Sequence, residues 1–247
     1  MLPVDWWRTY FSPLYRSMYE GPLLDEDQTE IEADFLAEVF APAGGLVLDV
    51  GCGFGRHLKR LRKQKIDVVG IDRFRHLLDR HPKRGRRAVQ GDMRALPFAG
   101  GAFSGLYCVF NTFGYFPHED NLAMLAEWAR VLSPGAPFVM QIPNRTGMAS
   151  LIRETAPRMM ISGDHELTEQ YRVDKDSKSL IGGGVWRHLG TGEEQAWQFA
   201  LRLYTKTEIE RAMTKVGLAL KSVSEDFDDE EFDPRQSTEM VLVAQKV

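Results

Sequence analysis

One feature constrains the fold of this chain most: a short apolar segment that leads directly into three closely spaced glycines. The segment is Leu46–Val50, and Gly51, Gly53 and Gly55 follow it. Its β-rich apolar composition suits a buried parallel strand. The glycines allow a turn in which a ligand lies against backbone N–H groups, because no Cβ is in the way. The pattern therefore predicts a strand, a ligand-binding turn and a helix in succession.

The same alternation of strand and helix continues along the chain. The five predicted strands of this kind are 46–50, 67–72, 88–92, 103–110 and 137–142. Segments with helical spacing separate them, and this repetition predicts an α/β fold with a doubly wound, mostly parallel sheet. Leu218–Val223 and Glu239–Gln245 are the last two predicted strands, after a helix that Thr205 caps.

Two segments differ from this alternation. Residues 143–204 show no long helical pattern but contain three alternating stretches, which we expect to form an antiparallel insert after the fifth strand. Residues 1–42 are aromatic-rich and have a helical pattern, in which Phe11, Tyr15 and Tyr19 would share one helix face. We expect one domain over residues 1–247 that includes both segments.

Composition excludes several classes of protein. With 43% hydrophobic and 27% charged residues the chain has the composition of an ordinary folded protein. Its two cysteines cannot form a disulfide framework or a four-cysteine zinc site, and the histidines lack metal-ligand spacing, so we expect no metal. The chain shows no secretory signal pattern and no apolar run of the ~20 residues that cross a bilayer. We therefore expect a cytoplasmic protein that does not bind a membrane.

Carboxylates end three successive predicted strands. Asp49 lies two residues before the first glycine, Asp72 ends the second strand, and Asp92 with Met93 ends the third. Ligands of open α/β sheets bind beyond the carboxyl ends of the strands, so the three acids should converge on one crevice. Asp49 suits a ligand with an ammonium group, Asp72 can accept hydrogen bonds from ribose hydroxyls, and Asp92 with Met93 suits an adenine ring.

These motifs resemble those of the class I S-adenosylmethionine-dependent methyltransferases. Leu48–Gly55 resembles the glycine motif of the family, Val69–Asp72 the ribose-binding strand end, and Gly91–Met93 the adenine-binding one. The resemblance implies a seven-stranded sheet with a C-terminal antiparallel hairpin and methyl transfer from S-adenosylmethionine to N or O of a small molecule. It implies a cofactor site in which the following residues take part: Tyr15, Asp49, Gly51, Cys52, Gly53, Asp72, Arg73, Asp92, Met93 and Asn111.

The acceptor site is predicted near the ends of the fourth and fifth strands. The string Asn111–Phe116 resembles that of small-molecule methyltransferases, and it lacks the two prolines of base-amino methyltransferases. Tyr115, His118, Asn144 and Arg145 are the candidate acceptor contacts, with His118 as a candidate general base. Residues 1–42 would act as a lid, and residues 143–204 would contribute to the acceptor pocket.

A basic segment leaves a second interpretation open. Between Arg56 and Arg87 there are 13 Lys or Arg against three Asp. This segment could grip RNA beside the crevice, which would make the chain an RNA or protein methyltransferase. We prefer solvated outer helices balanced by the acidic loop Glu225–Asp233. A nucleotide- or NAD-binding domain without methyl transfer is the third alternative, and the sequence leaves a monomer or a homodimer open.

Overall fold

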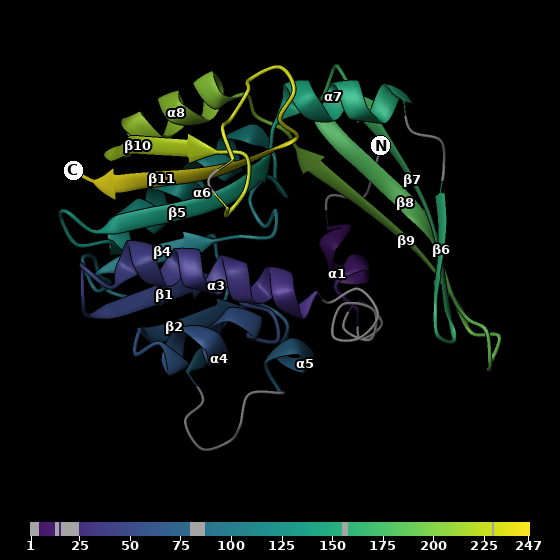
Figure 1. Ribbon diagram of the computed structural model, residues 1–247, viewed down its shortest axis with the longest axis horizontal. Coiled ribbons are helices and arrows are strands. Elements are labelled where there is room, and N and C mark those ends of the chain that lie inside the picture. The colour runs from purple at the N-terminus through teal and green to yellow at the C-terminus, as the bar shows by residue number, and fades with distance from the viewer. Residues whose placement is uncertain (1–4, 13–14, 16–24, 80–86, 155–157, 229) are drawn as a thin grey trace.

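The structure is a computed structural model that describes residues 5–12, 15, 25–79, 87–154, 158–228 and 230–247. Its centre is a seven-stranded sheet with the strand order β10-β11-β5-β4-β1-β2-β3 (Figure 1). The strands are β1 (Leu46–Val50), β2 (Asp67–Asp72), β3 (Ala88–Gln90), β4 (Gly105–Cys108), β5 (Pro137–Pro143), β10 (Leu218–Ser224) and β11 (Glu239–Lys246). β1 to β5 pair in parallel, whereas β11 is antiparallel to both β5 and β10. The predicted fold class, including the C-terminal hairpin, is confirmed.

Helices cover both faces of this sheet. α3 (Glu26–Phe40) and α4 (Arg56–Lys63) bury Leu36, Phe40 and Leu61 against one face. α6 (His118–Val131) and α8 (Lys206–Lys215) bury other apolar side chains, among them the fully buried Trp128, against the opposite face. Because each helix keeps an apolar stripe toward the strands, the sheet is buried between two helical layers.

Two strands end earlier than predicted. β4 stops at Cys108 because Phe110 and Asn111 adopt left-handed backbone conformations, with φ of 61° and 56°. β3 stops at Gln90 because Asp92 turns to form a bridge with Ala95. The short helix α5 (Arg75–Leu78) follows β2 as predicted.

Residues 143–204 form a second, separate sheet that extends from one end of the central sheet (Figure 1). This insert sheet contains β6 (Arg158–Ser162), β7 (His165–Asp174), β8 (Ser179–His188) and β9 (Glu194–Arg202). All its neighbouring strands are antiparallel, as predicted.

The prediction that this segment has no long helix is wrong. α7 (Arg145–Glu154) precedes the insert sheet and packs Met148 and Ile152, four residues apart, onto its apolar face. Gly147 weakens the helical pattern of this segment in the sequence. The close packing of the helix nevertheless requires a glycine, because a Cβ at this position would lie 2.1 Å from the carbonyl oxygen of Ser237. The glycine thus allows α7 to lie directly against the loop before β11.

Near the N-terminus, helix α1 lies between the central sheet and the insert sheet (Figure 1). α1 (Trp7–Tyr10) ends before Phe11, so one helix face does not carry both Phe11 and Tyr15 as we expected. Their rings nevertheless meet, with centroids 4.9 Å apart. Tyr19 lies outside the described residues. No helix among the described ranges is long and apolar enough to cross a membrane.

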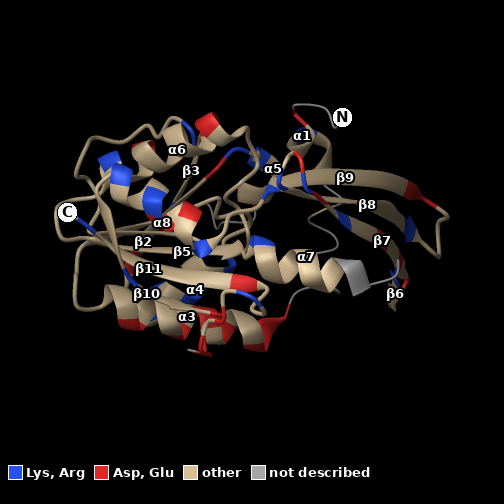
Figure 2. Cartoon of the chain, turned by 90° about the horizontal axis from the view of Figure 1, so that it is seen from above, with Lys and Arg blue, Asp and Glu red and all other residues tan. Residues whose placement is uncertain are grey.

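In the part of the chain that the structure describes, the basic helix α4 pairs with α3, whereas we expected the acidic loop Glu225–Asp233 to balance it. Arg60 pairs with Glu26 and Glu30, and Arg56 pairs with Glu32. Figure 2 shows the acidic positions along α3. At the end of the basic segment Arg87 pairs with Asp67. Arg84 and Arg86 lie outside the described residues.

A capping box starts α8, and its loss should destabilise the fold. Thr205 Oγ1 accepts a hydrogen bond from the Glu208 N–H at 3.3 Å, and the Glu208 carboxylate accepts one from the Thr205 N–H at 3.1 Å. We expect Thr205→Ala to lower the free energy of unfolding by about 1 kcal/mol. Urea unfolding followed by circular dichroism measures this change. Thr207→Ala, at an exposed position of the same helix, is the control; an equal loss in both variants would contradict the role of the cap.

Candidate active site

A pocket lies at the carboxyl ends of β1 and β2. It is lined by the strand ends and the turn after β1, by residues of α3 and α4, and by aromatic residues of α1, of the segment after α1 and of the β4–α6 loop. Nine of the ten predicted cofactor residues line it: Tyr15, Asp49, Gly51, Cys52, Gly53, Asp72, Arg73, Asp92 and Met93. The strand ends converge there because parallel strands leave their carboxyl ends at one edge of the sheet.

The turn after β1 requires its glycines. Gly51, Gly53 and Gly55 all have positive φ, at 76°, 53° and 79°. A Cβ at Gly51 would lie 2.5 Å from the Cγ2 atom of Thr112 in the β4–α6 loop. The turn can therefore pack against that loop and still present its backbone to the pocket.

Asp49 is a buried carboxyl group with an unsatisfied oxygen. It is 3% exposed, and no described residue donates a hydrogen bond to its Oδ2 atom. Burial raises its pKa to about 7, with a further increase from Asp72, although Tyr107 and Arg56 lower it. A buried acceptor without a partner is costly. This position therefore suits a cationic ligand group that supplies the missing donor.

Asp72 holds the glycine turn and the start of α5 in place. Its two oxygens accept hydrogen bonds from the Gly53 N–H at 2.9 Å and the Phe74 N–H at 2.8 Å. Burial raises the pKa of this carboxyl group, and these N–H donors lower it. Each oxygen keeps a second lone pair, so the carboxylate can still accept ligand hydroxyls.

Asp92 is already paired with two guanidinium groups. Arg94 binds it through Nε at 3.0 Å and Nη2 at 2.7 Å, and Arg73 forms a further ion pair. The hydrogen bonds from Arg94 hold the pKa of Asp92 below its ordinary value. The neighbouring Met93 is fixed through its carbonyl, which accepts a hydrogen bond from Trp128 Nε1 at 2.9 Å. Arg73 also stacks on the Trp7 ring at 4.5 Å and so connects this end of the pocket with α1.

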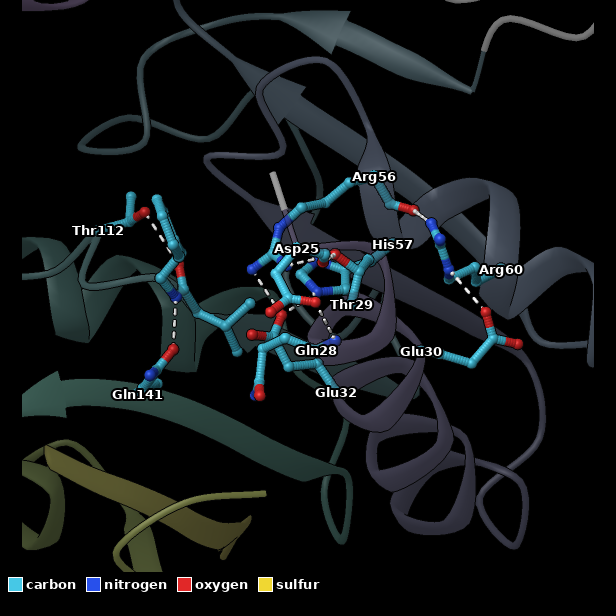
Figure 3. A network of polar contacts seen from close by, with 12 residues as sticks. Asp25, Gln28, Thr29, Glu30, Glu32, Arg56, His57, Arg60, Thr112 and Gln141 are labelled. Carbon is cyan, nitrogen blue, oxygen red and sulfur yellow. Dashed lines mark hydrogen bonds and ion pairs between the residues drawn. The ribbon is translucent and has the colours of Figure 1, made fainter. Parts of the chain in front are cut away.

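A buried ion-pair network, which the sequence analysis missed, forms the wall made by α3 and α4 (Figure 3). Glu32 Oε2 lies 2.5 Å from Arg56 Nη2 and 2.6 Å from His57 Nε2. Arg56 Nη1 also donates to Thr29 Oγ1 at 3.0 Å, and its guanidinium lies 5.0 Å from the centroid of the Phe110 ring. Arg56 and His57 directly follow the glycine turn, and this position could have identified them as site residues. No sequence pattern near Glu32, their partner on α3, marks it in the same way.

The charges of this network are set by burial and pairing. Burial lowers the pKa of His57 to about 4 despite its hydrogen bond to Glu32, so the imidazole is neutral at neutral pH. The pKa of Glu32 is lowered by His57 and Arg56, which together outweigh the opposing effect of its burial. The network thus presents a fixed arginine, held by one carboxylate, beside the glycine turn.

Four predicted site residues lie outside the pocket lining. Asn144 is buried and donates to the carbonyl oxygen of Ser237 at 2.7 Å, and Arg145 pairs with Glu208 at 2.6 Å. His118 starts α6, with its Nδ1 atom 3.4 Å from the Tyr204 hydroxyl. Asn111 donates to Glu239 Oε1 at 3.2 Å. Of the predicted acceptor contacts, only Tyr115 reaches the pocket.

Three comparisons with known proteins bear on this geometry. Residues 47–135 match a family described as a methyltransferase domain. The chain is 25% identical over 222 residues to the Streptomyces fradiae dTDP-3-amino-3,6-dideoxy-alpha-D-glucopyranose N,N-dimethyltransferase, covering 84% of this chain and 83% of that protein. It is 32% identical over 109 residues to a Xenopus tropicalis tRNA (carboxymethyluridine(34)-5-O)-methyltransferase, but spans only 17% of that protein.

Solved structures share the whole fold. The CcbJ methyltransferase from Streptomyces caelestis superposes with a TM-score of 0.81 at 21% identity, over 97% of this chain and 98% of that one. The sugar N-methyltransferase KedS8 from Streptoalloteichus superposes with a TM-score of 0.70 at 16% identity, over 94% and 92% of the two chains.

The fold is α/β, and the pocket at the strand ends suits an adenosine-containing ligand with a cationic tail. Residues 47–135 are a methyltransferase domain, and the whole chain shares the fold of solved S-adenosylmethionine-dependent methyltransferases. The pocket fits this cofactor on two observations: the unpartnered Oδ2 of Asp49 and the glycine turn that leaves room beside the backbone. Among the described residues no group of three or more His, Cys, Asp or Glu could hold a metal ion.

The raised pKa of Asp49 predicts that cofactor binding depends on pH. Below pH 7 the free protein holds Asp49 protonated, and it must lose that proton to pair with an ammonium group. The affinity for S-adenosylhomocysteine should therefore rise about tenfold per pH unit up to pH 7 and level off above it. Calorimetry between pH 5.5 and 8.5 tests this expectation.

Asp49→Asn is the control for this pH dependence. The amide keeps the shape of the side chain but cannot carry the charge, so binding should be weaker and independent of pH. A variant with the same pH profile as the wild type would show that another group titrates.

Glu239 predicts a pH dependence of stability. Burial raises its pKa from 4.5 to about 7, while Asn111 lowers it and Glu225 raises it further. The folded chain thus binds this proton more tightly than the unfolded chain, and the stability conferred by the neutral form is lost as the pH rises from 4.5 to about 7. Relative to the wild type, Glu239→Gln should gain roughly 2–3 kcal/mol between pH 5 and pH 8.

Urea unfolding at pH 5, 6.5 and 8 measures this gain. Glu230→Gln, at an exposed position of the loop that precedes β11, is the matched control and should follow the wild type. Parallel curves for Glu239→Gln and the wild type would contradict the assignment.

Proposed function

We propose that this methyltransferase acts on an amine nitrogen of a small molecule. The observation that carries the proposal is the composition of the pocket around the β4–α6 loop: Phe110, Thr112, Tyr115 and Phe116 line it with Phe11, and none of these five is a base that could deprotonate a hydroxyl group. His57 is bound to Glu32 and has a lowered pKa. A neutral amine carries its own lone pair, so its methylation needs orientation more than a base.

The cofactor contacts are assigned by chemistry. Asp49 would bind the ammonium group, and the backbone of Gly51 and Gly53 would lie along the methionine part. Asp72 would accept the ribose hydroxyls. Met93 would lie on the adenine face, and Asp92 would face the adenine amine after a change in its arginine contacts. Tyr15, Cys52 and Arg73 would complete the site, and Asn111 would support the loop that carries Phe110.

The reaction is a direct displacement. When bound, the cofactor supplies an electrophilic methyl group on a sulfonium sulfur. The acceptor nitrogen would take up this methyl group, the C–S bonding pair would remain on sulfur, and the methylated nitrogen would lose its proton to solvent. The protein contributes alignment: the turn and Asp49 fix one reactant, and the aromatic wall with Tyr115 fixes the other.

The amine assignment draws support from two relatives. One is named a sugar N,N-dimethyltransferase and matches 84% of this chain, and another is named a cypemycin N-terminal methyltransferase and is 34% identical over 129 residues. The tRNA methyltransferases match 40–44% of the chain. The RNA alternative is weaker here because several of the basic residues that supported it are paired with carboxylates.

Segments outside the central sheet complete the proposal. Residues 143–204 would shape the acceptor side together with the N-terminal segment 1–42. We propose a cytoplasmic enzyme, since Cys52 and Cys108 are both free and buried. It would work as a monomer or a homodimer and without a metal.

Methyl transfer to defined acceptors tests the proposal. We expect S-adenosylhomocysteine to form with amino sugars and other ring-bearing amines, and not with phenols or tRNA. Exclusive turnover of a phenol or tRNA would contradict the amine assignment.

Tyr115 and His118 form a matched pair for this assay. Tyr115→Ala should lower kcat/KM by about 10- to 1,000-fold, because it removes a contact in the pocket. His118→Ala should change it little, since this ring lies against Tyr204 outside the pocket. Both should bind S-adenosylhomocysteine like the wild type in calorimetry. A large effect of His118→Ala and none of Tyr115→Ala would move the acceptor site to the start of α6.

A further inference from the structure

We infer that the acceptor is an amine cation on a ring-shaped carrier that bears no phosphate or carboxylate group. The inference rests on the proposed function and narrows it, because amines linked to a nucleoside diphosphate would be excluded. It is carried by the balance of charges in the pocket and by the aromatic wall on its acceptor side.

Carboxylates outnumber cations among the described residues that line the pocket. Asp25, Glu32, Asp49, Asp72 and Asp92 line it against only two guanidinium groups, and no lysine lines it. At most one of these five carboxylates, Asp49, would be neutralised by the ammonium group of the cofactor. A phosphate that entered would therefore meet a surplus of negative charge, which costs more in a partly buried site than in water.

Among the residues that the structure describes, the pocket-lining Arg56 and Arg73 and the neighbouring Arg94 already pair with carboxylates. Arg56 pairs with Glu32, and Arg73 and Arg94 both pair with Asp92. Turning one of them toward a phosphate would leave a partly buried carboxylate without its partner. Two arginines further along the chain also have other partners and do not line the pocket. Arg145 pairs with Glu208, and Arg202 Nη1 donates to the Ser177 carbonyl at 3.3 Å.

The acceptor side of the pocket is built from aromatic rings. The Phe11 ring lies 4.9 Å from Tyr15, 5.6 Å from Phe74 and 5.7 Å from Tyr115, centroid to centroid, and all four line the pocket. Ring faces attract ammonium groups and provide flat apolar surface for the face of a saturated ring. Both properties suit an amine carried on a ring.

A second layer of rings supports this wall from the insert sheet. Trp6 lies 5.3 Å from Tyr115 and 6.0 Å from Phe199 on β9. Phe199 in turn lies on β8 at Gly182, where a Cβ would be 2.4 Å from its ring. Gly182 therefore sets how far Phe199 and Trp6 stand from the pocket, which makes it a positioning residue for the acceptor.

The chemistry of the proposed acceptor balances. The ammonium form, attracted by the carboxylates, releases one proton to solvent and becomes the neutral amine. Its lone pair then forms the bond to the methyl carbon as described above. Because a negative pocket stabilises the ammonium form, we expect KM for the acceptor to fall at low pH while kcat rises with pH.

Two probes that carry the same amino sugar, one without and one with a linked nucleoside diphosphate, test the inference. One is methyl 3-amino-3,6-dideoxy-α-D-glucopyranoside, and the other is the same sugar linked to dTDP, the form named in the Streptomyces fradiae relative. With protein saturated by S-adenosylhomocysteine, calorimetry should give an affinity for the glycoside that is about tenfold or more above that for the dTDP-linked sugar. Methyl transfer should show the same preference in kcat/KM.

A charge variant tests the cause of this preference. Asp25→Asn removes one pocket charge and keeps a residue type that caps α3. It should therefore reduce the ratio of the two affinities, glycoside over dTDP-linked sugar, severalfold. Asp27→Asn, two residues along the same helix and exposed, should leave it unchanged.

A pair of glycine variants tests the aromatic wall. Gly182→Ala should raise KM for the glycoside by about tenfold, because it pushes Phe199 toward Trp6, and should leave the affinity for S-adenosylhomocysteine unchanged. Gly183→Ala is the matched control, since its Cβ would point to the other side of the strand, 3.3 Å from the Trp197 carbonyl oxygen. Equal effects of the two variants on KM would overturn the role of the wall.

Failure of the inference and failure of the proposed function differ in outcome. Tighter binding and faster methylation of the dTDP-linked sugar would overturn the inference and leave amine methylation intact. Equal binding of both probes, or of neither, would also overturn it. Loss of the proposed function would appear separately, as methyl transfer to phenols or RNA and to no amine.

Discussion

The hydrogen bond from the Gly53 N–H to the Asp72 carboxylate is the contact on which the site depends. It joins the turn after β1 to the end of β2, two segments that are 19 residues apart in the chain. The other Asp72 oxygen accepts from the Phe74 N–H and so fixes the chain that leads into α5. Without this carboxylate the glycine turn could adopt many backbone conformations, because glycine is the residue with the fewest steric restrictions. The Asp72 side chain thus orders the turn and can still accept hydrogen bonds from a ligand.

From this turn the chain enters α4, and the start of that helix explains much of the electrostatics. Arg56 and His57 occupy its first turn and reach across to Glu32 on α3 (Figure 3). An arginine at the start of a helix is unfavourable with respect to the helix dipole. The carboxylate of Glu32 compensates for it, while the apolar residues of the two helices bury against the sheet. The basic composition of α4, which in the sequence suggested a polyanion site, is in this way matched by the acidic helix that precedes β1 (Figure 2).

Much of the fold and of the cofactor side could be predicted because the determining residues are close in sequence. Asp49 and the three glycines lie within seven positions, and the composition of each strand segment predicts that strand. The predicted acceptor residues other than Tyr115, and the predicted cofactor residue Asn111, were misplaced because they take partners far along the chain. Asn111 binds Glu239, His118 lies on Tyr204 and Asn144 holds the Ser237 carbonyl, at separations of 128, 86 and 93 residues. From the sequence, a residue just after a strand is predicted to line the pocket. Only the tertiary structure shows that its side chain binds a distant residue instead.

The N-terminal segment connects the two halves of the site, and this has an energetic consequence. On one side Trp7 stacks with Arg73, which pairs with Asp92. On the other side Tyr10 lies 5.6 Å from Phe199 of the insert sheet. A ligand group that takes the place of Arg73 on Asp92 therefore changes the support of Trp7, and with it the position of the rings that face the acceptor. Coupling between two binding events is reciprocal, so an acceptor that changes the affinity for the cofactor by this route would have its own affinity changed by the cofactor by the same factor. In the proposed function, the aromatic residues of α1 would therefore give the two ligands one shared wall.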